Sequence, residues 1–236
     1  MNVALVTTET THHVYYARKI AEKFPLGAIF VETRAAAAPF ETGHPFEAAR
    51  DEYERTALLG GAPGRLADVA RTTVVGSMND PSSVQALRQL APDVVVVFGT
   101  GKLQAPVIGA ARVAALNLHG GNPEQYRGLD THLWAVYHND FDNLVTTLHR
   151  LDEQLDTGDI VFQGAIALQR GMELHQLRAA NTEICVQLTA LALAALQDQG
   201  GLPARKQVSR GRYYSFMPAV LKQVCVDRWR KHVSAL

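Results

Sequence analysis

Short apolar runs alternate with segments of helical spacing along the first 120 residues of the chain. Apolar runs predict strands at residues 2–7, 27–31, 72–75, 93–98 and 114–119. Helical spacing predicts helices at residues 14–24, 46–59 and 81–90. Because strand and helix alternate, we expect an α/β fold with a doubly wound, mostly parallel sheet. In such sheets a ligand binds at the carboxyl ends of the strands, where the strand order reverses.

The second half of the chain continues this pattern and then changes character. It predicts a short helix at 133–139, strands at 144–151 and 160–168, and a long helix at 173–197. Residues 8–13 and 34–46 are polar or rich in Ala, Pro and Gly, and we expect loops there. We expect a catalytic domain over residues 1–200, with a C-terminal extension over residues 201–236 that packs on it.

Composition narrows the class of protein. With 236 residues the chain is long enough for one well-buried domain, and its 23 basic and 23 acidic side chains balance. The absence of a positive excess argues against a dedicated nucleic-acid binder. Cys185 and Cys225 lack the spacing of a disulfide framework or a zinc site, which indicates reduced thiols. The N-terminus resembles no signal peptide, and the apolar stretch 185–196 looks too short to span a bilayer, so we expect a cytoplasmic protein with no membrane partner.

Three side chains carry the chemistry that the sequence offers. Asn117 and His119 lie at the end of a buried strand, on one face because strand side chains alternate, and Asp156 follows 37 residues after the histidine. An amide can hold a developing oxyanion, an imidazole can move a proton, and a carboxylate can orient and charge the imidazole. Together these groups can move an acyl unit between nitrogens.

The surrounding motifs sharpen this interpretation. Asn117-Leu-His-Gly-Gly-Asn-Pro-Glu-Gln-Tyr-Arg-Gly128, followed by Leu155-Asp-Thr-Gly-Asp159, resembles the folate-dependent formyltransferases, most closely over about residues 90 to 165. The resemblance implies a Rossmann-like fold of the formyltransferase type, with 10-formyltetrahydrofolate as formyl donor and no metal. It makes Asn117, His119 and Asp156 the catalytic residues.

The resemblance also implies a folate pocket built by two loops. One follows the strand at 93–98, where glycines would let the backbone approach a flat ring closely, and the other spans residues 151–155. The first loop could equally be an ordinary strand-to-helix turn, and His149 could equally be a histidine that only packs behind the second loop. The residues assigned to the pocket are Phe98, Gly99, Thr100, Lys102, Leu103, His149, Leu151, Asp152 and Leu155.

Two further segments are candidates for the formyl acceptor. Thr8, His12 and His13 lie where glycinamide ribonucleotide formyltransferases have a glycine-rich phosphate loop, but those glycines are missing here. These residues bind a polar acceptor or only cap the next helix. Tyr126 and Arg127 belong by resemblance to a mobile loop after the catalytic strand, where Arg127 could pair with an anion or simply lie at the surface.

The identity of the acceptor rests on the family alone. The chain has no room for the C-terminal barrel of methionyl-tRNA formyltransferases, so we expect a small primary amine, best a nucleotide-linked amino sugar, and no nucleic acid. The sequence leaves open whether the protein forms a homodimer. Two alternatives remain: a 10-formyltetrahydrofolate hydrolase, and a non-catalytic folate or nucleotide binder.

Overall fold

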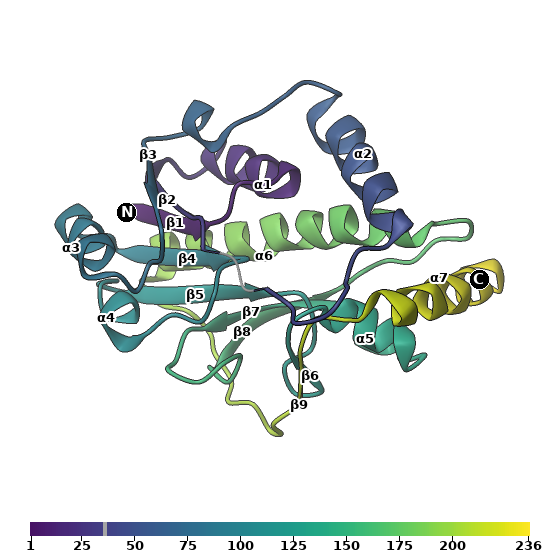
Figure 1. Cartoon of the computed structure of the whole chain (residues 1–236). Helices are drawn as coiled ribbons and strands as arrows, with labels where there is room; N and C mark the ends of the chain where they lie inside the picture. Colours follow the sequence, from purple (N-terminus) through teal and green to yellow (C-terminus); the bar gives the residue numbers. More distant parts are fainter. Residues whose placement is uncertain (35–36) are drawn as a thin grey trace.

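The computed structural model describes residues 1–34 and 37–236, so residues 35–36 of the expected loop at 34–46 lie outside the described part. Seven strands form one sheet in the order β3-β2-β1-β4-β5-β7-β8 (Figure 1). In chain order they are β1 (Val3–Thr7), β2 (Leu26–Glu32), β3 (Thr72–Val75), β4 (Val94–Phe98), β5 (Ala114–His119), β7 (Val145–Arg150) and β8 (Ile160–Ala165). The first five are parallel, β7 is antiparallel to β5, and β8 is antiparallel to β7.

The centre of the sheet is buried on both faces. Every residue of β1 and of β4 is buried, as the unbroken apolar runs of these two strands require. The strand order reverses between them, because β1 pairs with β2 on one side and with β4 on the other. A ligand-binding crevice is therefore expected beyond Thr7 and Phe98, the last residues of these strands.

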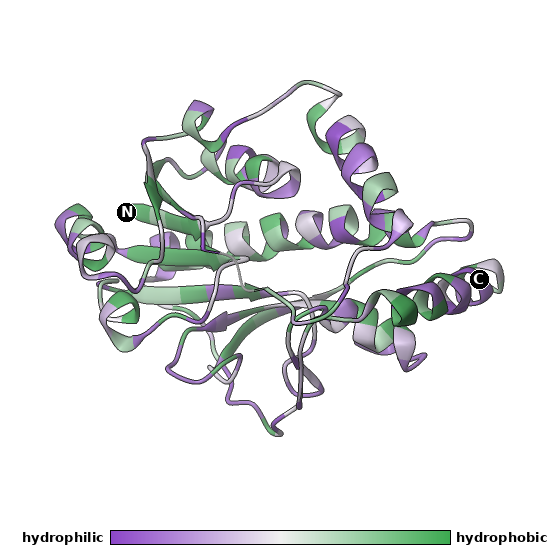
Figure 2. Cartoon of the chain, viewed as in Figure 1, coloured by the Kyte–Doolittle hydropathy of each residue, from purple (hydrophilic) through white to green (hydrophobic). Residues whose placement is uncertain are grey.

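Helices cover both faces of the sheet. α1 (Thr11–Ala21) and α6 (Leu177–Gln199) enclose one apolar core, and α3 (Pro81–Leu90) and α4 (Ala105–Ile108) enclose the other. Figure 2 shows the central strands β1 and β4 near the hydrophobic end of the scale. α2 (Pro45–Leu59) packs against α1 and α6 farther from the sheet, and only Glu54 of this helix is buried.

A third cluster lies beside the carboxyl ends of the strands. β6 (Tyr126–Gly128) and β9 (Arg212–Tyr214) form a small parallel ladder, and α5 (Thr131–Tyr137) packs against α7 (Ala219–Ser234) around a fully buried Trp229. Short 3₁₀ turns complete the chain at η1 (Leu66–Asp68), η2 (Phe141–Asn143) and η3 (Leu174–Gln176). The segment after residue 200 therefore contacts the rest of the chain through both a strand and a helix.

The fold class is confirmed, whereas three local predictions are wrong. α1 begins at Thr11, three residues before the predicted start, so His12 and His13 lie on a helix. Tyr126 to Gly128 form a strand paired with β9 instead of a mobile loop. η3 and α6 together span residues 174–199, longer than the apolar stretch 185–196, and this segment is long and apolar enough to cross a membrane by length and composition alone. Its packing against α1, β7 and β8 accounts for that apolar composition.

Candidate active site

A cavity of about 370 Å³ opens at the carboxyl ends of β4 and β5. The side chains of Asn117, His119 and Asp156 all line it, although Asp156 comes from the loop between β7 and β8. His119 and Asp156 are buried. The structure therefore brings together the three groups that the sequence singles out, at the strand edge where a doubly wound sheet binds its ligand.

Asn117 is oriented by the neighbouring strand. It lies directly opposite His149 in the antiparallel pairing of β5 with β7, and its Nδ2 is 3.1 Å from His149 Nε2. His149 Nδ1 is 2.8 Å from the carbonyl oxygen of Arg150, so we assign the ring proton to Nδ1. His149 Nε2 then accepts one amide hydrogen of Asn117. The second amide hydrogen of Asn117 has no acceptor in the described part of the chain and is available to a ligand oxygen.

His119 is held in one tautomer by a backbone carbonyl. Its Nε2 lies 2.8 Å from the oxygen of Tyr126, an acceptor only, so Nε2 carries the proton. Nδ1 is then the nitrogen that takes up a further proton, and it faces Asp156 Oδ2 at 3.7 Å. Burial lowers the pKa of His119, while the Asp156 carboxylate opposes that shift. The imidazole is therefore a neutral base whose protonated form has a counter-charge beside it.

Asp156 stays ionised despite its burial. Burial alone would raise the pKa of this carboxyl, but the positive charge of a protonated His119 or His149 beside it and the backbone amide of Gly128 hold the pKa well below its usual range. The Gly128 amide donates to Oδ2 at 2.9 Å. Gly128 has φ of +96° and a Cβ there would meet the Tyr214 carbonyl at 2.1 Å, so only glycine allows this close approach.

The two loops assigned to the folate also line the cavity. Phe98 to Leu103 and Leu151 to Leu155 both contribute, and every position predicted for that pocket is among the lining residues. The glycine-containing loop is fixed from behind because the buried Glu32 carboxylate accepts the amides of Gly101 and Met78 at 3.0 Å each. Its conformation is therefore set before any ligand binds.

The N-terminus of α1 contributes two adjacent histidines to the cavity wall. His13 Nδ1 lies 3.0 Å from the hydroxyls of both Thr8 and Thr10, and its buried Nε2 has no partner among the described residues. Burial is the main cause that lowers the pKa of His12 and of His13. Both rings are therefore neutral polar groups at the cavity.

Three predicted acceptor residues do not line the cavity, which corrects the sequence interpretation. Thr8 supports His13 from behind. Tyr126 offers its backbone carbonyl to His119 and turns its hydroxyl to Asp140. Arg127 is buried, and its guanidinium donates to the carbonyls of Leu155 and Gly211. Of the three, Arg127 holds the loop that carries Asp156, through the carbonyl of Leu155.

The tail contributes to the same task. Gln207 Nε2 donates to the backbone oxygens of Asp156 at 3.0 Å and of Gly158 at 2.9 Å. The backbone oxygen of Gly211 accepts a hydrogen bond from Arg127 Nε at 2.8 Å. The C-terminal segment therefore holds the backbone that carries the Asp156 carboxylate.

The wall formed by α2 and α6 was largely hidden in the sequence. Phe46 and Arg50 come from α2, and Arg178 and Asn181 come from α6. The sequence offered two signals: the segment 42–46, which ends at Phe46 and could equally contact the acceptor or pack, and the high charge of residues 46–59, which is equally typical of a solvated helix face. Only the packing of these two helices over the strand ends shows that they reach the cavity.

Comparison with known proteins agrees with this geometry. Residues 51–190, more than half of the chain, match the family model described as formyl transferase. The chain belongs to the formyl transferase family, so the resemblance noted in the sequence is confirmed. The methionyl-tRNA formyltransferase of Caldanaerobacter subterraneus subsp. tengcongensis is 24% identical over 153 residues, which cover 64% of this chain and 48% of that protein. The chain thus spans about half the length of this curated relative.

Solved structures share the fold at low sequence identity. A 4-N formyltransferase from Francisella tularensis has a TM-score of 0.60 at 14% identity and covers 97% of this chain and 87% of its own. The formyltransferase PseJ from Anoxybacillus kamchatkensis has a TM-score of 0.51 at 16% identity, covering 91% and 86%. That structure holds UDP-4,6-dideoxy-4-formamido-L-AltNAc and tetrahydrofolate.

Proposed function

We propose that this chain transfers a formyl group from 10-formyltetrahydrofolate to the primary amine of a small molecule, for which a nucleotide-linked amino sugar is our first candidate. The observation that carries the proposal is the meeting of Asn117, His119 and Asp156 in one cavity, beside two loops that line it, the first of which is held by the Glu32 carboxylate. A cytoplasmic location and the absence of nucleic-acid and membrane partners belong to the same proposal.

The first chemical step is attack of the amine nitrogen on the formyl carbon. A C–N bond forms and the carbonyl oxygen becomes an oxyanion, which the unused amide hydrogen of Asn117 stabilises. The amine loses a proton to His119 Nδ1, the nitrogen that the Tyr126 carbonyl leaves free. Asp156 stabilises the resulting imidazolium at 3.7 Å.

The second step releases tetrahydrofolate. The oxyanion re-forms the carbonyl, and the bond from the formyl carbon to the folate nitrogen breaks. His119 returns its proton to that leaving nitrogen, so the site ends in its starting protonation state. The donor supplies the whole formyl group and the amine supplies the transferred proton, which His119 carries; the chain adds the amide dipole of Asn117 and the charge of Asp156.

The choice of acceptor rests on less direct support. A structure that shares this fold holds a UDP-linked sugar whose name carries a formamido group, beside tetrahydrofolate. The curated relatives, by contrast, carry the name methionyl-tRNA formyltransferase. Both acceptor classes therefore belong in the same test.

The experiment is a spectroscopic assay of 10-formyltetrahydrofolate conversion to tetrahydrofolate with amino-sugar nucleotides, simple amines and methionyl-tRNA as acceptors. Conversion that depends on an amino-sugar nucleotide supports the proposal. Conversion only with methionyl-tRNA would keep the reaction and replace the acceptor. Conversion without acceptor would identify a hydrolase. Folate binding without conversion under any condition would contradict the catalytic role and favour a binding protein.

A further inference from the structure

The cavity has two chemically different walls. The catalytic residues and the folate loops form one, and helices α2 and α6 form the other. The second wall presents Phe46, Arg50 and Arg178 beside His12 of α1. Two arginines on a wall that contains no residue predicted to bind the folate call for a chemical explanation.

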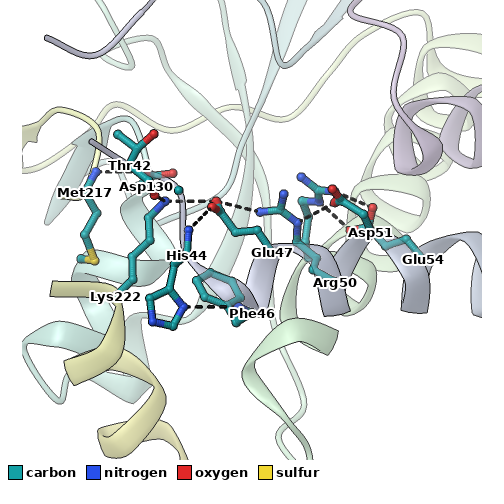
Figure 3. Close-up of polar contacts among 12 residues, drawn as sticks. Thr42, His44, Phe46, Glu47, Arg50, Asp51, Glu54, Asp130, Met217 and Lys222 are labelled. Atoms are coloured by element: carbon teal, nitrogen blue, oxygen red, sulfur yellow. Dashed lines mark hydrogen bonds and ion pairs between the residues drawn. The ribbon is translucent and has the colours of Figure 1, made fainter. Parts of the chain in front are cut away.

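Both guanidinium groups are held in place by carboxylates outside the cavity lining. Arg178 donates to Glu54 through Nε at 2.5 Å and Nη2 at 2.6 Å, and Nη2 also lies 2.9 Å from Asp51. Arg50 donates to Asp51 through Nε at 3.1 Å and approaches Glu47 through Nη1 at 3.5 Å. Figure 3 follows this row of charges along α2. None of these three carboxylates is among the described residues that line the cavity.

Each guanidinium keeps unused donors. Within residues 1–34 and 37–236, Arg178 Nη1 and Arg50 Nη2 make no hydrogen bond to the protein. A terminal nitrogen of this kind carries two N–H groups that match the oxygens of a carboxylate or a phosphate. Because the other nitrogens are already bound to fixed carboxylates, little side-chain freedom is left to lose when an anion binds.

The acidic residues of the cavity are committed elsewhere. Asp152 and Asp156 belong to the catalytic loop, and Asp130 accepts the backbone amide of Met217 at 2.8 Å. The pKa of His12 is lowered by burial and further by the charges of Arg178 and Arg50. Arg50 and Arg178 are therefore the charged side chains that this wall presents to the cavity, while the carboxylates that pair with them lie outside the lining.

We propose that Arg50 and Arg178 bind an anionic group, a phosphate or a carboxylate, that the acceptor amine carries. This inference rests on the proposed formyl transfer and adds the chemical class of its acceptor: an amine with a negative charge at the end remote from the nitrogen. A nucleotide-linked amino sugar meets this condition through its phosphates, and an amino acid meets it through its carboxylate.

The first test measures anion binding without any turnover. Inorganic pyrophosphate, phosphate and malonate are titrated calorimetrically into the protein saturated with tetrahydrofolate. Arg50→Gln removes the charge, and Arg55→Gln is the matched control, because Arg55 lies exposed on the same helix, pairs with Glu52 and does not line the cavity. We expect Arg50→Gln to weaken binding by about 10-fold or more, since a hydrogen bond to a charged group contributes about 1.5–3 kcal/mol. Arg55→Gln should bind as the wild type does.

The choice of probe distinguishes the sources of the anion. Binding of phosphate and pyrophosphate but not malonate indicates a phosphorylated acceptor, and the reverse indicates a carboxylate. No binding of any probe to the wild type, or equal loss in both variants, would overturn the inference.

The second test separates this inference from the proposed function. The ratio of kcat/KM for an anionic amine to that for its uncharged analogue should fall in Arg50→Gln and stay unchanged in Arg55→Gln. Formyl transfer with an unchanged ratio in both variants would refute the anion site and keep the reaction. Arg50-dependent binding of pyrophosphate without transfer to any amine would refute the reaction and keep the anion site.

Discussion

Replacement of Asp156 by asparagine isolates the charge of the catalytic carboxylate from its structural roles. Asp156 has φ of +55°, in the left-handed region that asparagine also tolerates. Its Oδ2 accepts the Gly128 amide, and an asparagine Oδ1 can accept the same hydrogen bond. The folded structure should therefore persist while the negative charge disappears.

The separation of the two groups sets the size of the effect. Asp156 Oδ2 lies 3.7 Å from His119 Nδ1, and both side chains are buried. Two unit charges at about 4 Å attract by about 4 kcal/mol at an effective dielectric constant of about 20. Loss of that attraction in a transition state that contains the imidazolium lowers the rate by about a thousandfold, since about 1.4 kcal/mol is a factor of ten.

The same substitution should move the pH dependence of the reaction. Burial already lowers the pKa of His119, and the Asp156 carboxylate counteracts that shift. Without the carboxylate the pKa falls further, so the acid limb of the kcat/KM profile should move to lower pH. The neutral imidazole would then be present over a wider pH range but would be a weaker base.

The assay is folate conversion under single-turnover conditions, recorded from acid to neutral pH. Asp159→Asn is the control, because the Asp159 side chain lies in the same loop and makes no hydrogen bond or ion pair within the described residues. Turnover of Asp156→Asn close to that of the control, with an unmoved acid limb, would refute the role assigned to this carboxylate. A loss of folded structure by circular dichroism would instead show that the charge also supports the fold.

Three further changes test the packing around the site. Gly158→Ala places a Cβ 1.7 Å from the carbonyl oxygen of the last residue of β7, so we expect a stability loss of about 3 kcal/mol in urea unfolding. Gly201→Ala, whose Cβ would meet nothing within 4 Å, should match the wild type. Arg178→Gln leaves the fully buried Glu54 without its bidentate partner and should cost about 3–5 kcal/mol of unfolding free energy; a loss below 1 kcal/mol would contradict that pairing. Burial lowers the pKa of His132 from 6.5 to about 4, so between these pH values the unfolded chain binds a proton that the folded chain does not. The free energy of unfolding should therefore decrease as the pH is lowered from about 6.5 to about 4. In His132→Gln the urea midpoint should depend less on pH over this range.

The sequence determined the fold class, and it brought forward the proposed catalytic residues, for a local reason. Strands buried on both faces read as unbroken apolar runs, and the predicted bounds of β3, α3 and β5 agree with the structure to the residue. Asn117 and His119 share one face because strand side chains alternate, so two residues that are close in sequence are also close in space. The family motif then added Asp156, which no periodicity could place beside them.

Tertiary structure alone decided what the residues around the centre do. Arg127 looked like a ligand for an anion, but the pairing of β6 with β9 buries it against backbone carbonyls. Arg50 and Arg178 lie 128 positions apart and neither was marked out by the sequence, yet the packing of α2 on α6 brings both to the cavity. A side chain's burial and partners depend on contacts between distant segments, and hydrophobic periodicity reports only which face of its own element a residue occupies.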